Sequence, residues 1–151
     1  MLSLGTRQNE IARRTHLLDR GVWNQPQHEV LPHVPEVLHS LPPVDEPHRL
    51  RFARWLADEQ SPLTARVQVN RVWQTVFGTG LVETSEDFGT RAPQPEYIEL
   101  LDHLAVQFMR NDWSLKWLLR TITASQVYQQ TSRATPELID FDPTNRLLAR
   151  G

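Results

Sequence analysis

Proline placement is the feature that most limits how this chain can fold. Six of its eleven prolines lie between Pro26 and Pro47. Each proline fixes φ and biases the preceding residue toward extended backbone, so helix is not expected there. Apolar residues alternate with these prolines: Val30, Leu31, Val34, Val37, Leu38 and Leu41. Residues 1–47 are therefore predicted to form an extended proline-rich strap that packs on a core. Within it, residues 15–21 have the composition of a short strand without an obvious partner.

Helical spacing of apolar residues begins near His48. It predicts four helices, at residues 48–57, 62–77, 95–110 and 114–130. Ser61 and Ser114 are suited to the N-cap position, and Pro62 is suited to the first position of a helix. Gly78 is a typical stop signal for the second helix.

The end of the sequence has the start signals of one more helix. Asp142 and Pro143 are typical of an N-cap and a first helical position, yet the sequence ends at Gly151 after two turns at most. This pattern predicts a helical domain of residues 48–151 that is truncated at its C-terminus. The expected fold is mainly α, an irregular bundle of about four helices with the extended proline-rich N-terminal strap.

Composition removes several classes of function. The chain has no cysteine, which excludes disulfides, zinc–thiolate sites, iron–sulfur clusters and cysteine nucleophiles. The net charge of -2 does not favour nucleic acid, and acidic residues in 83–102 offset the locally basic stretch 48–71. No apolar run approaches the length of about 18 residues that a membrane span needs, so no membrane insertion is expected. The first 14 residues do not have a signal-peptide pattern, which leaves the localisation of this chain open.

No local motif indicates an enzyme or a cofactor. The sequence lacks GxGxxG, GxxxxGK[ST], HExxH, GxSxG and EF-hand patterns. His28, His33 and His39 share the strap without the spacing of a metal site. Glu99 and His103 are four residues apart on the polar face of a predicted helix, which favours a solvated pair over a metal half-site. We therefore assign no catalytic residue, metal or cofactor to this chain.

Polar residues of the helix predicted at 62–77 are the best candidates for a binding site. At about 100° per residue, Arg66 and Asn70 fall inside an apolar arc, where burial without a partner is costly. One interpretation is structural: Arg66 binds a loop carbonyl, or a carboxylate such as Glu86 or Asp87. The alternative is that these polar groups form the floor of a ligand pocket. The full candidate site is Arg66, Asn70, Arg71, Trp73, Glu86 and Asp87.

Several blocks of the sequence resemble one known family. They are Leu63-Thr64-Ala65-Arg66-Val67, Val69-Asn70-Arg71-Val72-Trp73-Gln74, Phe77-Gly78-Thr79-Gly80-Leu81-Val82, Glu86-Asp87-Phe88-Gly89 and Trp113-Ser114-Leu115-Lys116. In this order they resemble the C-terminal domain of unknown function, family 1553, of large planctomycete-type proteins, over nearly the whole chain. The resemblance implies an exported parent protein with a cytochrome c-like domain upstream. It implies no established activity. It does not imply that this chain binds haem, because the sequence lacks the haem-binding segment.

Two functions follow as hypotheses. The first is a non-catalytic structural or interaction module of a larger exported, cytochrome-associated protein, whose partner is another domain of the parent or a separate protein. The alternative is a glycan-binding or glycan-degrading domain with a polar site on helix 62–77 and loop 83–91, for which carbohydrate is the ligand. Residues 91–98 lack the glycine-rich Ser-His-Pro stretch of the family, so a site in that loop is expected to be impaired. The alternative predicts that the six candidate residues converge around one open pocket.

Overall fold

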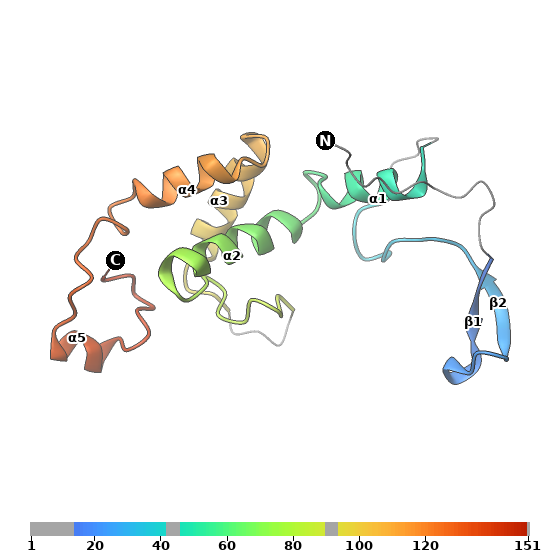
Figure 1. The fold of residues 1–151 in the computed structure, drawn as a ribbon, viewed down its shortest axis with the longest axis horizontal. Coiled ribbons are helices and arrows are strands. Elements are labelled where there is room, and N and C mark those ends of the chain that lie inside the picture. Colours follow the sequence, from blue (N-terminus) through green and yellow to red (C-terminus); the bar gives the residue numbers. More distant parts are fainter. Residues whose placement is uncertain (1–13, 42–45, 90–93, 151) are drawn as a thin grey trace, which may run out of the picture. The chain divides into compact units, whose positions relative to one another are not determined.

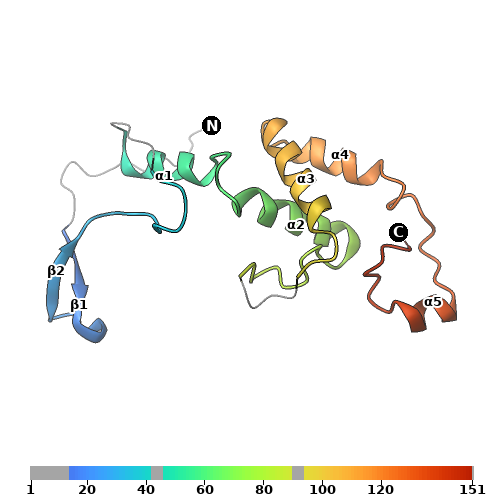
Figure 2. The ribbon, with the colours of Figure 1, turned by 180° about the vertical axis from the view of Figure 1, so that it is seen from behind.

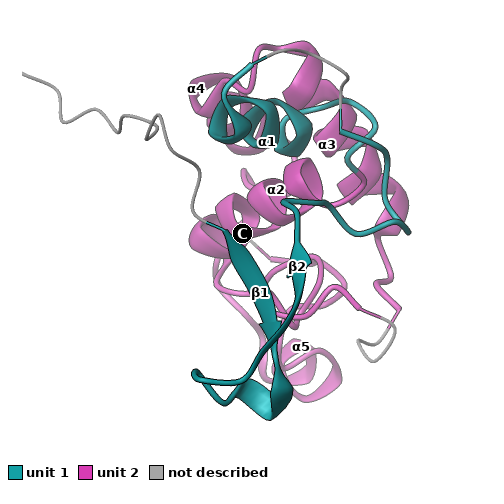
Figure 3. Ribbon diagram, turned by 90° about the vertical axis from the view of Figure 1, so that its right-hand side faces the viewer, with its two compact units in different colours: residues 1–61 teal, residues 62–151 magenta. Residues whose placement is uncertain are grey.

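The fold is mainly helical, as predicted. The computed structural model describes residues 14–41, 46–89 and 94–150. In this part of the chain it contains five α-helices and one two-stranded sheet (Figure 1). Contacts divide the chain into two compact units, residues 1–61 and residues 62–151 (Figure 3). Each unit has its own internal packing and is described separately.

The first unit contains a β-hairpin. β1 (Thr15–Leu18) pairs antiparallel with β2 (Pro26–Val30), and Thr15 lies opposite Val30. A 3₁₀ turn, η1 (Asp19–Gly21), follows β1, and both Arg20 and Gly21 have positive φ. The sequence predicted the first strand without a partner. The partner is β2 in the proline-rich segment, where Pro26 occupies the first strand position and therefore interrupts no ladder.

Helix α1 (His48–Leu56) belongs to the same unit and is held by the segment that precedes it. The Trp55 indole N–H donates to the His39 carbonyl at 2.7 Å, and the two rings stack with centroids 4.9 Å apart. His39 Nε2 lies 3.1 Å from the Trp55 carbonyl. The proline-rich segment thus packs on α1 through His39. Its packing on the remaining helices stays a prediction.

The second unit is built on three helices that contact one another. These are α2 (Thr64–Phe77), α3 (Ile98–Arg110) and α4 (Leu115–Thr123), which lie side by side in Figures 1 and 2. Their apolar faces meet in one core, whose members include Val69, Trp73, Leu101, Leu104, Phe108, Leu118 and Ile122. The periodicity that predicted these helices therefore also identified the faces that they bury.

Helix α2 starts later than predicted and ends as predicted. Thr64 is its first residue and Leu63 its N-cap, in place of Pro62 and Ser61. The Pro62 carbonyl instead accepts a hydrogen bond from the Arg66 guanidinium, at 2.8 Å. Gly78 ends the helix with φ +85°, a left-handed conformation that glycine adopts without strain.

Helix α4 begins as predicted but is shorter. Ser114 caps it, since its hydroxyl accepts the Trp117 N–H. The predicted end near residue 130 was wrong, because the helix stops at Thr123. The Ser125 hydroxyl donates to the Ile122 carbonyl at 2.6 Å and accepts the Tyr128 N–H. A short polar side chain here replaces the backbone partners that a continuing helix would supply.

The last part of the chain differs most from the prediction. Helix α5 (Pro136–Phe141) was not predicted, although Thr135 is its N-cap and Pro136 is at its start. The helix predicted from Asp142 does not form in the described residues. The Asp142 carboxylate accepts the Arg146 and Leu147 N–H groups, at 2.8 and 2.9 Å, and so fixes a compact loop. Across residues 14–41, 46–89 and 94–150, no helix has both the length and the hydrophobicity for a bilayer crossing.

Candidate functional site

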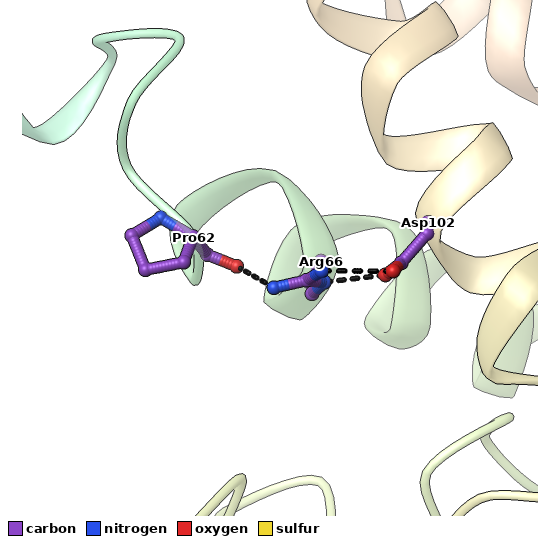
Figure 4. A network of polar contacts seen from close by, with 3 residues as sticks. All are labelled: Pro62, Arg66 and Asp102. Carbon is purple, nitrogen blue, oxygen red and sulfur yellow. Dashed lines mark hydrogen bonds and ion pairs between the residues drawn. The ribbon is translucent and has the colours of Figure 1, made fainter.

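Arg66 pairs with a carboxylate, but not with one of those predicted. Its Nε lies 2.5 Å from Asp102 Oδ1 and its Nη2 lies 2.9 Å from Asp102 Oδ2, which joins α2 to α3 (Figure 4). The prediction of Glu86 or Asp87 as the partner was wrong, because α3 places Asp102 beside the first turns of α2. The hydrogen bonds from Arg66 lower the pKa of Asp102, and the same bonds raise the pKa of Arg66.

Asn70 is fully buried and all its polar atoms are used inside the protein. Its Nδ2 donates to the Val82 carbonyl at 3.0 Å and to the Ser85 hydroxyl at 3.2 Å, and its Oδ1 accepts the Val82 N–H at 2.8 Å. The amide therefore replaces a missing backbone partner for the loop that follows α2. Gly80 passes close to it: a Cβ built there would lie 2.7 Å from Asn70 Nδ2.

The remaining predicted residues lie at separate places. Arg71 is exposed and lines an apolar groove with Leu63, Val67, Phe108, Trp113 and Leu115. Trp73 is buried and lines a different hollow. Glu86 and Asp87 are exposed, and Asp87 Oδ1 accepts the Gly89 N–H in a turn. The six candidate residues are thus not gathered around one open pocket in the described part of the chain.

The hollow beside Trp73 is lined by residues from four segments that are separated along the chain. We call it the aromatic crevice. It is lined by Trp73 and Phe77 at the end of α2, by residues from the 79–83 loop, by residues 94–97 before α3, and by residues from the 144–148 loop. The aromatic members are Trp73, Phe77 and Tyr97, and the charged members are Glu83, Glu96 and Arg146.

The polar groups of the crevice differ in how they are bonded. Arg146 Nη2 lies 3.1 Å from Glu96 Oε1, so these two charges are paired. Glu83 has no ion-pair partner in the described residues and is exposed. Trp73 is 4% exposed, and no described residue accepts its indole N–H. The crevice therefore presents a free donor and a free acceptor beside aromatic rings.

Comparison with known proteins identifies a family. The PSD1 family model, described as "Protein of unknown function (DUF1553)", matches residues 48–151. The chain belongs to this family. The match confirms the resemblance to family 1553 for residues 48–151. No curated protein and no solved structure gave a significant match to this chain.

The DUF1553 match includes the whole aromatic crevice. It begins at the first residue of α1 and continues through the second unit. Within the described residues of this DUF1553 chain, no three His, Asp or Glu side chains are grouped as metal ligands would be.

Sequence reasoning selected Trp73 and the loop 83–91 that contains Glu83, but it missed the remaining members of the crevice. No site was proposed for Phe77, Glu96, Tyr97 or Arg146. No local signal could have grouped these residues, because they come from four segments between residues 73 and 148 that only packing brings together.

Proposed function

We propose that this DUF1553 domain is a non-catalytic binding module of a larger exported, cytochrome-associated protein, and that it binds its ligand in the aromatic crevice. The proposal rests on a difference between two sets of polar groups in the second unit: some are hydrogen-bonded within the protein and others are not. Arg66 and Asn70, set in the apolar face of α2, are bonded to Asp102 and Val82. The Trp73 indole N–H and the Glu83 carboxylate of the crevice have no bonding partner among the described residues and are available to a ligand.

The displaced pKa values in the second unit have structural causes. Active sites gather titratable groups with displaced pKa values in one cleft. Here the pKa of Asp102 is lowered by its bonds to Arg66. The pKa of Glu137 is lowered because its carboxylate accepts its own backbone N–H and the Thr135 hydroxyl at the start of α5. Both shifts have a structural cause, and neither residue lines the crevice.

The glycan-degrading alternative has less support. It needs acidic groups in a cleft, and its carboxylates were Glu86 and Asp87. Both are exposed, and Asp87 already accepts the Gly89 N–H at 2.7 Å. A carboxylate that holds a surface turn is poorly placed for general acid or base chemistry.

The larger protein is part of the proposal because of the sequence blocks shared with the family. Those blocks imply an exported parent with a cytochrome c-like domain, so the partners proposed for this module are the other domains of that parent or a separate envelope protein. An upstream reading frame that encodes an export signal and a haem-attachment segment supports this context. An upstream frame that encodes neither removes it.

A turnover assay tests the non-catalytic proposal. The purified chain and Asp87→Asn are incubated with neutral and sulfated polysaccharides, and released reducing ends are measured against a blank. We expect neither protein to exceed the blank. Release by the unaltered chain that disappears in Asp87→Asn contradicts the proposal.

A further inference from the structure

We infer that the aromatic crevice takes a neutral saccharide, with one sugar ring against Phe77 and Tyr97 and its hydroxyls bonded by Trp73 and Glu83. This inference rests on the proposed binding function and names its ligand class. It is carried by the aromatic lining, by the type of the unbonded polar groups and by the charge of the crevice.

The aromatic lining provides an apolar surface held in a fixed orientation. The Trp73 and Phe77 rings lie 4.4 Å apart between centroids with a tilt of 31°, and Tyr128 contacts Phe77 edge-on at 6.1 Å. These two contacts restrict the orientation of the Phe77 ring. Phe77 and Tyr97 are only half-buried, and both line the crevice. The C–H face of a pyranose ring is an apolar surface that packs on such rings.

The unbonded polar groups match hydroxyls. The Trp73 indole N–H can only donate a hydrogen bond, and the ionised Glu83 carboxylate can only accept one. A hydroxyl both donates and accepts, so a ligand with several hydroxyls satisfies both groups. An organic cation would suit Glu83 but would leave the Trp73 N–H without an acceptor. A purely apolar ligand would satisfy neither group.

The charge of the crevice selects against anionic sugars. Arg146 is already paired with Glu96 at 3.1 Å, which leaves Glu83 as the uncompensated charge among the three charged groups that line the crevice. A sulfate or a uronate placed there would meet a carboxylate, with no unpaired cation among the described residues that line the crevice, and like charges repel. The favoured ligand is therefore uncharged.

The loop that closes one side of the crevice is held in place before any ligand binds. Asn145 Nδ2 donates to the Arg150 carbonyl at 2.8 Å, and the Asn145 Oδ1 accepts the Arg150 N–H at 3.2 Å. Asp142 is buried and accepts two N–H groups of the same loop. Because the loop is fixed, less ordering entropy opposes binding.

Calorimetric titration of the full chain tests the inference. The probes are cellohexaose, xylohexaose, mannohexaose and chitohexaose, with a sulfated chondroitin hexasaccharide as the charged comparison. We expect at least one neutral hexasaccharide to bind and the sulfated one to bind at least about tenfold more weakly. Glu83→Gln replaces a charged hydrogen-bond acceptor with a neutral one and is expected to weaken binding by about tenfold. Tyr97→Ala is expected to weaken it as well.

Arg71→Ala is the matched control, because Arg71 is an exposed residue of α2 that lines the separate apolar groove. It should bind like the unaltered chain. Circular dichroism melts show whether each variant is folded, and exposed Glu83 is a site where Gln should not disturb folding.

Three results would overturn the inference. These are no binding of any neutral hexasaccharide at millimolar concentration, sulfated binding as tight as neutral binding, or unchanged affinity in both folded crevice variants. Reducing ends measured in the same mixtures separate the two proposals. Their release contradicts the non-catalytic function, whereas absent binding without release contradicts only the saccharide ligand.

Discussion

The Arg66 guanidinium and the Asp102 carboxylate join α2 to α3 by two hydrogen bonds, of 2.5 and 2.9 Å. Two parallel bonds between a guanidinium and a carboxylate define the relative orientation of both groups, which a single ion pair does not. The side chains are 33% and 40% exposed, so water screens part of their attraction. The pair therefore sets the register of the two helices more than it adds to stability.

Asp102→Asn should lower the free energy of unfolding by about 1 kcal/mol, because it removes the charge from a partly exposed pair. Urea unfolding measures the change. Glu99→Gln on the same helix is the control, since Glu99 is exposed. An equal loss in both variants would show that the effect comes from the charge of α3 and not from the pair.

The contribution of this pair should depend on pH. The pKa of Asp102 is lowered from its ordinary value of 3.8 by the hydrogen bonds from Arg66. A lowered pKa in the folded state means that the stabilisation is fully present above 3.8 and is lost as the pH falls through the lower folded value. The difference between the unaltered chain and Asp102→Asn should therefore be constant near neutral pH and should shrink below about pH 4. Urea unfolding at a series of pH values tests this, and a difference that persists unchanged to pH 2 contradicts it.

Asn70→Ala should be among the most damaging single changes in the second unit. It leaves the buried N–H and carbonyl of Val82 without their partner. The expected loss is about 2–4 kcal/mol in the free energy of unfolding. Arg71→Ala, at the exposed neighbouring position, should cost less than about 0.5 kcal/mol. Thermal and urea unfolding compare the two, and similar losses would mean that the Asn70 bonds contribute little.

Gly80→Ala should destabilise the same region through a steric clash. Its Cβ would lie 2.6 Å from the Val82 carbonyl oxygen and 2.7 Å from Asn70 Nδ2, and neither can move without breaking the buried bonds. A cost of about 1–3 kcal/mol is expected. Gly89→Ala is the control, because its Cβ would meet only the exposed Asp87 carboxylate at 2.8 Å, whose movement breaks a single exposed hydrogen bond to the Gly89 N–H. If both variants melt at the same temperature, the close approach at Gly80 carries no strain.

The sequence by itself determined the features that depend on neighbours along the chain. The apolar periodicity located α1, α2, α3 and α4, because a helix buries one face at a spacing of about 3.6 residues. Gly78 and Ser114 were identified as cap residues from local properties alone. Gly78 can adopt a positive φ at the end of a helix, and the Ser114 hydroxyl can accept an N–H from the first turn of the helix that follows it. The family blocks also follow one another along the chain, so they could be recognised without coordinates.

Only the tertiary structure decided which distant groups meet. Arg66 was predicted to need a hydrogen-bond partner, and Glu86 and Asp87 were the carboxylates suggested. Because α2 packs on α3, the partner is Asp102. The aromatic crevice needs residues from four segments, and no periodicity in the sequence specifies a distance between side chains that lie far apart along the chain. The free-energy cost of burying an unpaired polar group determined that Arg66 and Asn70 must have hydrogen-bond partners. The arrangement of the helices and loops determined which residues those partners are.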